Sequence, residues 1–111
     1  MPTHIFVYGL FRCSAKPLLG NMVFVARDTV TGHLYRVNDH YPGFVPGADG
    51  LVWGDVCVVD ESVLPALDEF EGPEFRRRRI VTSLGHECWV YEFIDEVGDA
   101  RRIRGGDWIL R

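Results

Sequence analysis

The chain has 111 residues, 47% of them hydrophobic, and its 12 basic and 16 acidic side chains give a formal net charge of −4. This length predicts a single domain over residues 1–111 with one core, and leaves too little material for two domains. Because a negative overall field repels phosphate groups, neither nucleic acid nor a membrane surface is expected as a partner.

Cysteine usage and the N-terminal sequence predict a cytoplasmic protein. Cys13, Cys57 and Cys88 form no CxxC pair, and their odd number does not suggest a disulfide framework. The opening residues Met1–His4 lack the basic region of a signal peptide. No apolar run approaches the roughly 18 residues that a membrane span needs.

The first predicted element is a buried strand over Ile5–Tyr8 that ends at Gly9. Backbone N–H groups at such a strand end can hold a carboxylate or a phosphate. Pro17 and Gly20 then punctuate a segment that is predicted to be a connecting loop. Strand character resumes at Val23–Ala26.

The middle of the chain predicts two more strands with a loop between them. Gly32–Val37 alternates apolar with polar residues, as a half-buried strand does. Tyr41–Gly47 contains two prolines and two glycines, which predicts a turn-rich loop. Leu51–Val59 is the strongest strand pattern, and Gly54 within it indicates a bulge or the close approach of another backbone.

One short amphipathic helix is predicted next. Asp60 or Ser62 can cap it, and Gly72-Pro73 ends it. Its apolar stripe recurs at spacings of three and four residues and consists of Val63, Leu64, Leu67 and Phe70.

The last third predicts a hairpin of two strands, Phe75–Thr82 and Glu87–Ile94, followed by a tail with a glycine pair. Strands therefore dominate, with one clear helix. This pattern predicts an α+β fold in which a mixed, strand-dominated sheet closes into a small barrel-like structure, rather than a βαβ array.

Several motifs in this order resemble the γ-glutamylcyclotransferase-like (AIG2-like) family. Val7–Arg12 resembles the Tyr-Gly-x-Leu-Arg loop of that family, and Leu67–Gly72 resembles its helix-end signature. Further similarities to bacterial members lie in Phe75 and Arg77, Gly32–Tyr35, Tyr41–Gly43, Trp89–Tyr91 and Gly106–Trp108.

The resemblance implies an enzyme that cyclises a γ-glutamyl group. In this family the α-amine attacks the side-chain carbonyl, releases an amine or amino acid and leaves 5-oxoproline, without a metal, a cofactor or a covalent intermediate. One carboxylate near both nitrogens can serve as base and then as acid, and Glu71 occupies that position. A glutamate partly removed from water has a raised pKa, which makes it a better base.

The resemblance also implies a binding loop for the substrate carboxylate. Backbone N–H groups of Gly9, Leu10 and Phe11 are expected to hold it while Tyr8 orders the turn. Arg12 can pair with the substrate, although an arginine beside a turn more often holds its own loop. Leu10 and Phe11 stand where the family commonly has threonine or serine and then leucine, so a hydroxyl donor is missing.

Other residues have simpler interpretations. Tyr91 is expected either to contact the glutamyl unit or to belong to the core. Asp68 is expected to brace local structure, and Glu69 to face solvent. The run Arg76–Arg79 splits into two pairs on opposite faces of a strand, which argues against a nucleic-acid patch. The histidines and cysteines have no metal-ligand spacing, and Cys13 has no histidine nearby in the sequence to activate it as a nucleophile.

Three functional hypotheses follow. The first is a γ-glutamylamine cyclotransferase that acts on a small-molecule γ-glutamyl amide. The second has the same chemistry but removes a γ-glutamyl protecting group in a biosynthetic pathway. The third is a ligand-binding member of the fold that has lost catalysis; retention of Glu71 argues against it, and Leu10 leaves it open.

Overall fold

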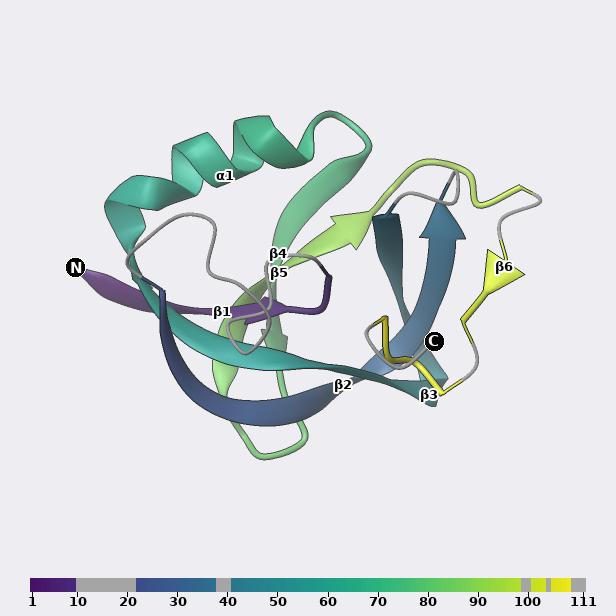
Figure 1. Ribbon diagram of the computed structural model, residues 1–111, viewed down its shortest axis with the longest axis horizontal. Helices are drawn as coiled ribbons and strands as arrows, with labels where there is room; N and C mark the ends of the chain where they lie inside the picture. The colour runs from purple at the N-terminus through teal and green to yellow at the C-terminus, as the bar shows by residue number, and fades with distance from the viewer. Residues whose placement is uncertain (10–21, 38–40, 99–100, 104, 109–111) are drawn as a thin grey trace.

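The computed structural model describes residues 1–9, 22–37, 41–98, 101–103 and 105–108, and shows a strand-dominated sheet with one short α-helix (Figure 1). The strands are β1 (Pro2–Val7), β2 (Val23–Val37), β3 (Tyr41–Asp60), β4 (Phe75–Val81), β5 (Glu87–Phe93) and β6 (Arg101–Arg102), and a 3-10 turn, η1 (Glu61–Val63), leads into α1 (Leu64–Glu71).

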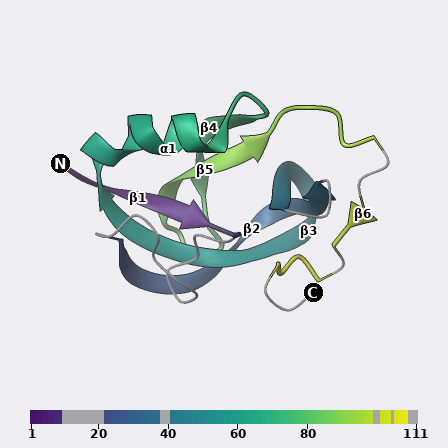
Figure 2. The ribbon, with the colours of Figure 1, turned by 45° about the horizontal axis from the view of Figure 1, so that its top comes forward.

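The sheet is mixed and curled. Its strand order is β4-β5-β1-β3-β2-β6, and β1 pairs antiparallel with β3 but parallel with β5. One further parallel pairing, Phe44 with Glu92, joins β3 to β5 and draws the sheet around on itself. The resulting curled half-barrel, with its single α-helix along one side (Figure 2), confirms the predicted fold class.

The predicted loop at Tyr41–Gly47 is wrong, because this segment opens the 20-residue strand β3. It pairs with β2 in a continuous antiparallel register from Val37 and Tyr41 to Gly32 and Pro46. Gly43 is required for packing rather than turning, since a Cβ there would lie 3.0 Å from the ring of Phe93. Local composition indicated a turn, and pairing with β2 overrode it.

Gly54 was expected to mark either a bulge or the close approach of another backbone, and the structure shows the close approach. A Cβ at Gly54 would lie 2.6 Å from the Phe6 ring and 2.6 Å from the carbonyl oxygen of Val7. The register shifts in the pairing of β2 with β3 instead fall between Phe24 and Ala26 and between Thr31 and Gly32. The glycine therefore lets β1 lie close against β3, which fixes where β1 ends.

The helix begins and ends close to its predicted bounds, with two corrections. The predicted caps lie upstream of α1, because Asp60 ends β3 and Ser62 belongs to the 3-10 turn; α1 begins after Val63, whose side chain makes no capping hydrogen bond. Leu64 and Leu67 are buried as expected, whereas Phe70 is 63% exposed. Only part of the apolar stripe therefore packs on the sheet.

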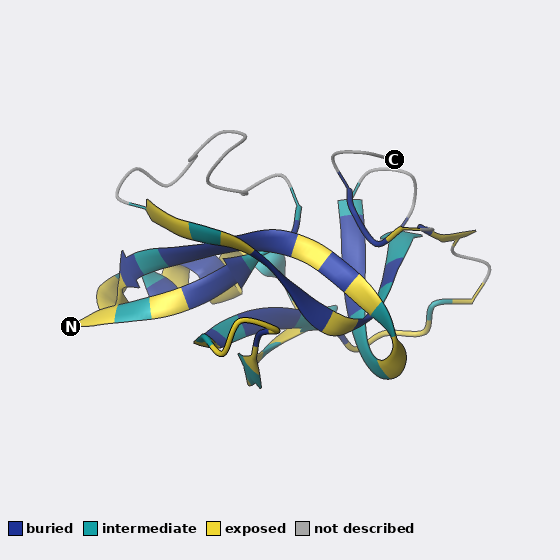
Figure 3. Ribbon diagram, turned by 90° about the horizontal axis from the view of Figure 1, so that it is seen from below, coloured by how far each residue is buried: buried dark blue, intermediate teal, exposed yellow. Residues whose placement is uncertain are grey.

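The core lies between the faces of the curled sheet, where buried positions run along the strands (Figure 3). Leu64 and Leu67 of α1 pack there against Ile5 of β1 and Tyr91 of β5. Cys88 is a free, buried thiol. Cys57 is disulfide-bonded, which the cysteine pattern did not predict. No helix in the described ranges has the length and apolarity of a membrane span.

Candidate active site

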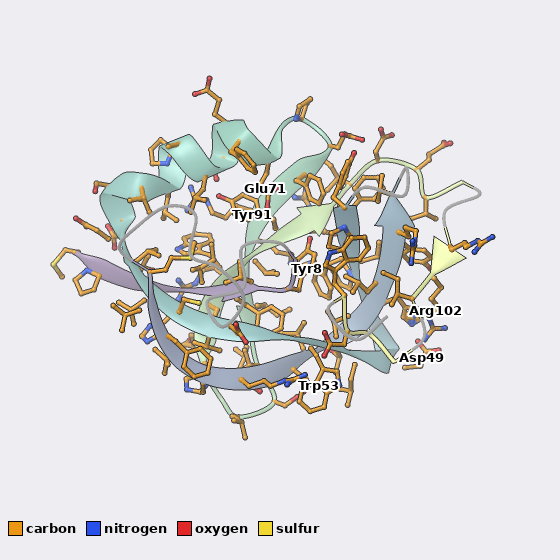
Figure 4. The ribbon with its side chains drawn as sticks, viewed as in Figure 1. Tyr8, Asp49, Trp53, Glu71, Tyr91 and Arg102 are labelled. Atoms are coloured by element: carbon orange, nitrogen blue, oxygen red, sulfur yellow. The ribbon has the colours of Figure 1, made fainter. Side chains whose placement is uncertain are left out.

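A cavity of about 320 Å³ opens where the end of β1, the end of α1 and the start of β3 meet. Figure 4 shows Glu71, Tyr91 and Tyr8 in this region, with Asp49 and Arg102 far from it at the other end of the molecule. The lining of the cavity is mostly apolar and aromatic and consists of Phe6, Val7, Tyr8, Gly9, Tyr41, Pro42, Phe70, Glu71, Glu74, Phe75 and Tyr91.

Glu71 is the last residue of α1, and Gly72 ends the helix with a φ of 85° that favours glycine. The carboxyl group faces an apolar cavity, and among the described residues it has no hydrogen bond or ion pair. Burial raises the pKa of Glu71 to about 7. A carboxyl group in this state can accept and return a proton near neutral pH.

Tyr8 directly follows the last residue of β1, and its hydroxyl group both donates and accepts a hydrogen bond. Its hydroxyl donates to the Tyr91 carbonyl oxygen at 2.6 Å and accepts from the Phe44 backbone N–H at 3.2 Å. Burial, and then the nearby charge of Glu71, raise the pKa of Tyr8 above its ordinary value. Tyr8 is therefore a neutral, fixed wall that joins β1, β3 and β5 beside the carboxyl group.

Gly9 completes the inner edge of the cavity. A Cβ at this position would lie 2.9 Å from the Pro42 ring, so glycine lets the chain after β1 lie against the start of β3. The remaining predicted binding residues, Leu10, Phe11 and Arg12, lie outside the described residues, as does Cys13. The described part of the predicted loop, Tyr8 and Gly9, lines the same cavity as Glu71.

Tyr91 also lines the cavity and is anchored from α1. Its hydroxyl donates to Asp68 at 2.7 Å, and the same carboxylate accepts two hydrogen bonds from Arg77, at 2.9 and 3.1 Å. Arg77 in turn lies 4.4 Å from the centre of the Trp89 ring. Asp68 thus joins α1 to β4 and β5, as expected for a bracing residue.

Two of the three carboxylates on α1, those of Asp68 and Glu71, are therefore in opposite conditions. Burial acts to raise the pKa of Asp68, but hydrogen bonds from Arg77 and Tyr91 outweigh it and the pKa is lowered. Glu71 has burial without such donors. The residue suited to proton transfer is the one whose carboxyl group has no such partners.

Sequence reasoning missed one wall of the cavity. Tyr41 donates its hydroxyl to both oxygens of Glu74, at 2.9 and 3.2 Å, and its ring lies 6.0 Å from that of Phe75. Tyr41 belongs to the segment predicted as a loop, and Glu74 lies in the turn after α1. In the sequence, the one local feature that indicates this wall is Phe70, an aromatic residue directly before Glu71 at the end of the predicted helix.

The remaining candidates lie elsewhere. Glu69 is exposed and outside the cavity lining. The arginine run alternates as predicted: Arg76 and Arg78 hydrogen bond to Glu92, at 3.2 and 3.3 Å, while Arg79, like Arg77, lies over the Trp89 ring. Within the described ranges, no group of three or more histidine, cysteine or acidic side chains could hold a metal ion.

Residues 5–110 match the model of a protein family described as gamma-glutamyl cyclotransferase, AIG2-like. The chain belongs to this family. The match covers the end of β1, which leads to Gly9, and the end of α1, where Glu71 lies.

Several solved structures are similar to this chain, and one of them is an AIG2-like protein. Protein ytfP from Escherichia coli is 33% identical, with 96% of each chain covered and a TM-score of 0.74. An uncharacterized protein from Pyrococcus horikoshii is 28% identical over 96% of this chain and 89% of its own, with a TM-score of 0.76. An AIG2-like protein from Mus musculus is 25% identical over 86% and 80%, with a TM-score of 0.68. No curated protein matches the sequence.

Proposed function

We propose that this member of the gamma-glutamyl cyclotransferase family acts on a γ-glutamyl amide of an amine and releases 5-oxoproline and the free amine. The α-amine nitrogen forms a bond to the γ-carbonyl carbon, and the bond from that carbon to the leaving nitrogen breaks. One proton leaves the attacking nitrogen and one joins the leaving nitrogen. The step consumes no water and requires no oxidant, reductant or metal.

Glu71 is the proposed general base and then the proposed general acid. The observation that carries this role is a carboxyl group on the wall of an apolar cavity, with a pKa raised to about 7 by burial. A pKa near the working pH balances the population of the ionised base against its strength as a proton acceptor. The same oxygen can then protonate the departing amine, because both nitrogens bond to one carbon in the tetrahedral intermediate.

Tyr8, Gly9 and Tyr91 are proposed to position the glutamyl unit. Both tyrosine hydroxyls are fixed by hydrogen bonds within the protein, Tyr8 to the Tyr91 carbonyl oxygen and Tyr91 to Asp68. Preorganised walls of this kind favour the folded substrate conformation that closes a five-membered ring. The loop Leu10–Arg12 is proposed to contribute backbone N–H groups for the substrate carboxylate and, through Arg12, a cation.

The proposal is tested by incubating the purified protein with γ-glutamyl amines, γ-glutamyl amino acids and γ-glutamyl-ε-lysine, and measuring the 5-oxoproline released. We expect release from the amines, unchanged by a chelator, and far less release with the Glu71→Gln variant. No product from any substrate would overturn the proposal and leave the non-catalytic binding member of the fold. Turnover confined to a γ-glutamylated biosynthetic intermediate would favour the removal of a protecting group.

A further inference from the structure

The outer wall of the active-site cavity is formed by aromatic rings around a single carboxylate, that of Glu74. Phe70, Tyr41 and Phe75 supply the rings. Glu74 is held in the turn between α1 and β4, where its carbonyl oxygen accepts the backbone N–H of Ile94 at 2.8 Å. This wall begins next to Glu71, so it lies where the leaving amine of a bound γ-glutamyl amide would extend.

The Glu74 carboxylate is held in place but not neutralised. Both of its oxygens accept from the Tyr41 hydroxyl, a neutral donor. The arginines of the neighbouring strand are engaged elsewhere: Arg76 hydrogen bonds to Glu92, and Arg77 to Asp68. None of the described residues that line the cavity is basic. The described lining therefore presents negative charge and aromatic faces.

We propose that Glu74, positioned by Tyr41, makes the enzyme selective for a leaving amine that carries a second, positively charged group. This inference rests on the proposed function and specifies the substrate class of the same site. A distal ammonium or guanidinium group gains an ion pair with Glu74 and a favourable contact with the ring faces of Tyr41 or Phe75. A distal carboxylate in the same place is repelled by Glu74 and finds no cation on the described lining.

Three amides that differ only at the far end of the leaving group test the proposal. γ-Glutamyl-putrescine ends in an ammonium group, γ-glutamyl-pentylamine ends in an uncharged methyl group of the same size, and γ-glutamyl-δ-aminovalerate ends in a carboxylate. We expect kcat/KM to fall in that order, by about two- to fivefold for the first step, which is the range for a partly exposed ion pair. Added salt should shrink the difference.

The ratio of kcat/KM for the ammonium and methyl substrates isolates the contribution of Glu74. In Glu74→Gln we expect this ratio to fall most of the way toward one, because the amide keeps the size of the side chain and removes its charge, while the contact with the aromatic rings remains. Tyr41→Phe should lower the ratio by a smaller factor, since the carboxylate remains but loses its hydrogen bond. Glu69→Gln makes the same change of net charge outside the cavity and should leave the ratio as in the wild type.

The possible outcomes distinguish a failure of the proposed charge selectivity from a failure of the proposed cyclotransferase activity. If the methyl substrate is cyclised as fast as the ammonium substrate, the charge selectivity is wrong while the cyclotransferase proposal stands. If Glu74→Gln retains the full wild-type ratio, another group sets the selectivity and the assignment to Glu74 is wrong. If neither the three amides nor any member of the wider panel yields 5-oxoproline, both the proposed function and the proposed selectivity are wrong.

Discussion

Two regions of the molecule remove a carboxylate from water, and they do so with opposite results. On β2, beside the turn that joins β4 to β5, Asp28 is 3% exposed, and it accepts hydrogen bonds from the backbone N–H groups of Thr29 and Leu84, at 2.7 and 3.2 Å. His86 Nδ1 lies 2.9 Å from the same carboxylate. At the end of α1, Glu71 is partly buried among apolar groups without such partners.

The pKa values follow the partners rather than the burial. Burial acts to raise the pKa of Asp28, but hydrogen bonds from Thr82, His86, Thr29 and Leu84 outweigh it and lower the pKa. Burial without donors raises the pKa of Glu71 to about 7. A satisfied buried carboxylate holds a turn in place, whereas an unsatisfied one retains the capacity to exchange a proton.

The largest expected effect is on catalysis at the unsatisfied carboxylate. Glu71→Gln keeps the shape of the side chain but removes the proton acceptor, so 5-oxoproline formation should fall by about 10²- to 10⁴-fold. The measurement is kcat/KM on the best amide of the panel, with circular dichroism to verify the fold. Glu69→Gln, an exposed glutamate on the same helix, serves as the control and should retain wild-type activity. Full activity in Glu71→Gln would end its assignment as general base.

The next effect is on stability at the satisfied carboxylate. Thr29 and Leu84 both donate to Oδ1 of Asp28, whereas His86 Nδ1 lies against Oδ2. Asp28→Asn keeps one acceptor oxygen but removes the charge and turns the other oxygen into a donor, so the hydrogen bonds become weaker and one side of the buried group loses its acceptor; the change should cost roughly 2–4 kcal/mol in urea unfolding. The matched control is Asp49→Asn. Asp49 also lies 2.7 Å from a histidine, His33, but is 81% exposed, and should lose no more than about 1 kcal/mol. Equal losses in the two variants would contradict the role given to burial.

A third prediction concerns the pH dependence of stability at Glu71. The folded pKa, about 7, exceeds the ordinary value of 4.5, so folding favours the protonated form. This stabilisation is fully present below about pH 4.5 and is lost as the pH rises through about 7. Glu71→Gln should therefore gain stability relative to the wild type, by about 1–3 kcal/mol, between about pH 5 and about pH 8.5. Parallel stability curves would show that the carboxyl group is not desolvated.

The smallest effect is expected at the link between the cavity wall and Asp68. Tyr91→Phe removes the hydroxyl that donates to Asp68 at 2.7 Å, which should cost about 1 kcal/mol in unfolding free energy. If Tyr91 also positions the glutamyl unit, KM should rise several-fold. Tyr35→Phe, on β2 outside the cavity lining, should change neither quantity. A fall in kcat without a rise in KM would assign Tyr91 a role in the chemical step instead.

Much of the site was predictable because its parts are local in the sequence. The apolar run before Gly9 indicated a strand end, and the stripe ending at Gly72 placed Glu71 at the last turn of a helix. Tyr41 and Glu74 were missed because they are far apart in the sequence and meet only in the folded protein. Tyr41 lies in a proline- and glycine-rich segment that becomes a strand only by pairing with β2, which no local pattern reports.

The sequence by itself determined the alternation of the strands, the single helix, the family and the identity of the candidate base, since each depends on residues close together in the chain. Only the tertiary structure decided what each carboxylate does. The donors to Asp28 come mainly from residues 82–86, and the apolar walls around Glu71 come from β1, β3 and β5. Desolvation and hydrogen bonding depend on what surrounds a group in space, so the pKa of Glu71 is a property of the fold.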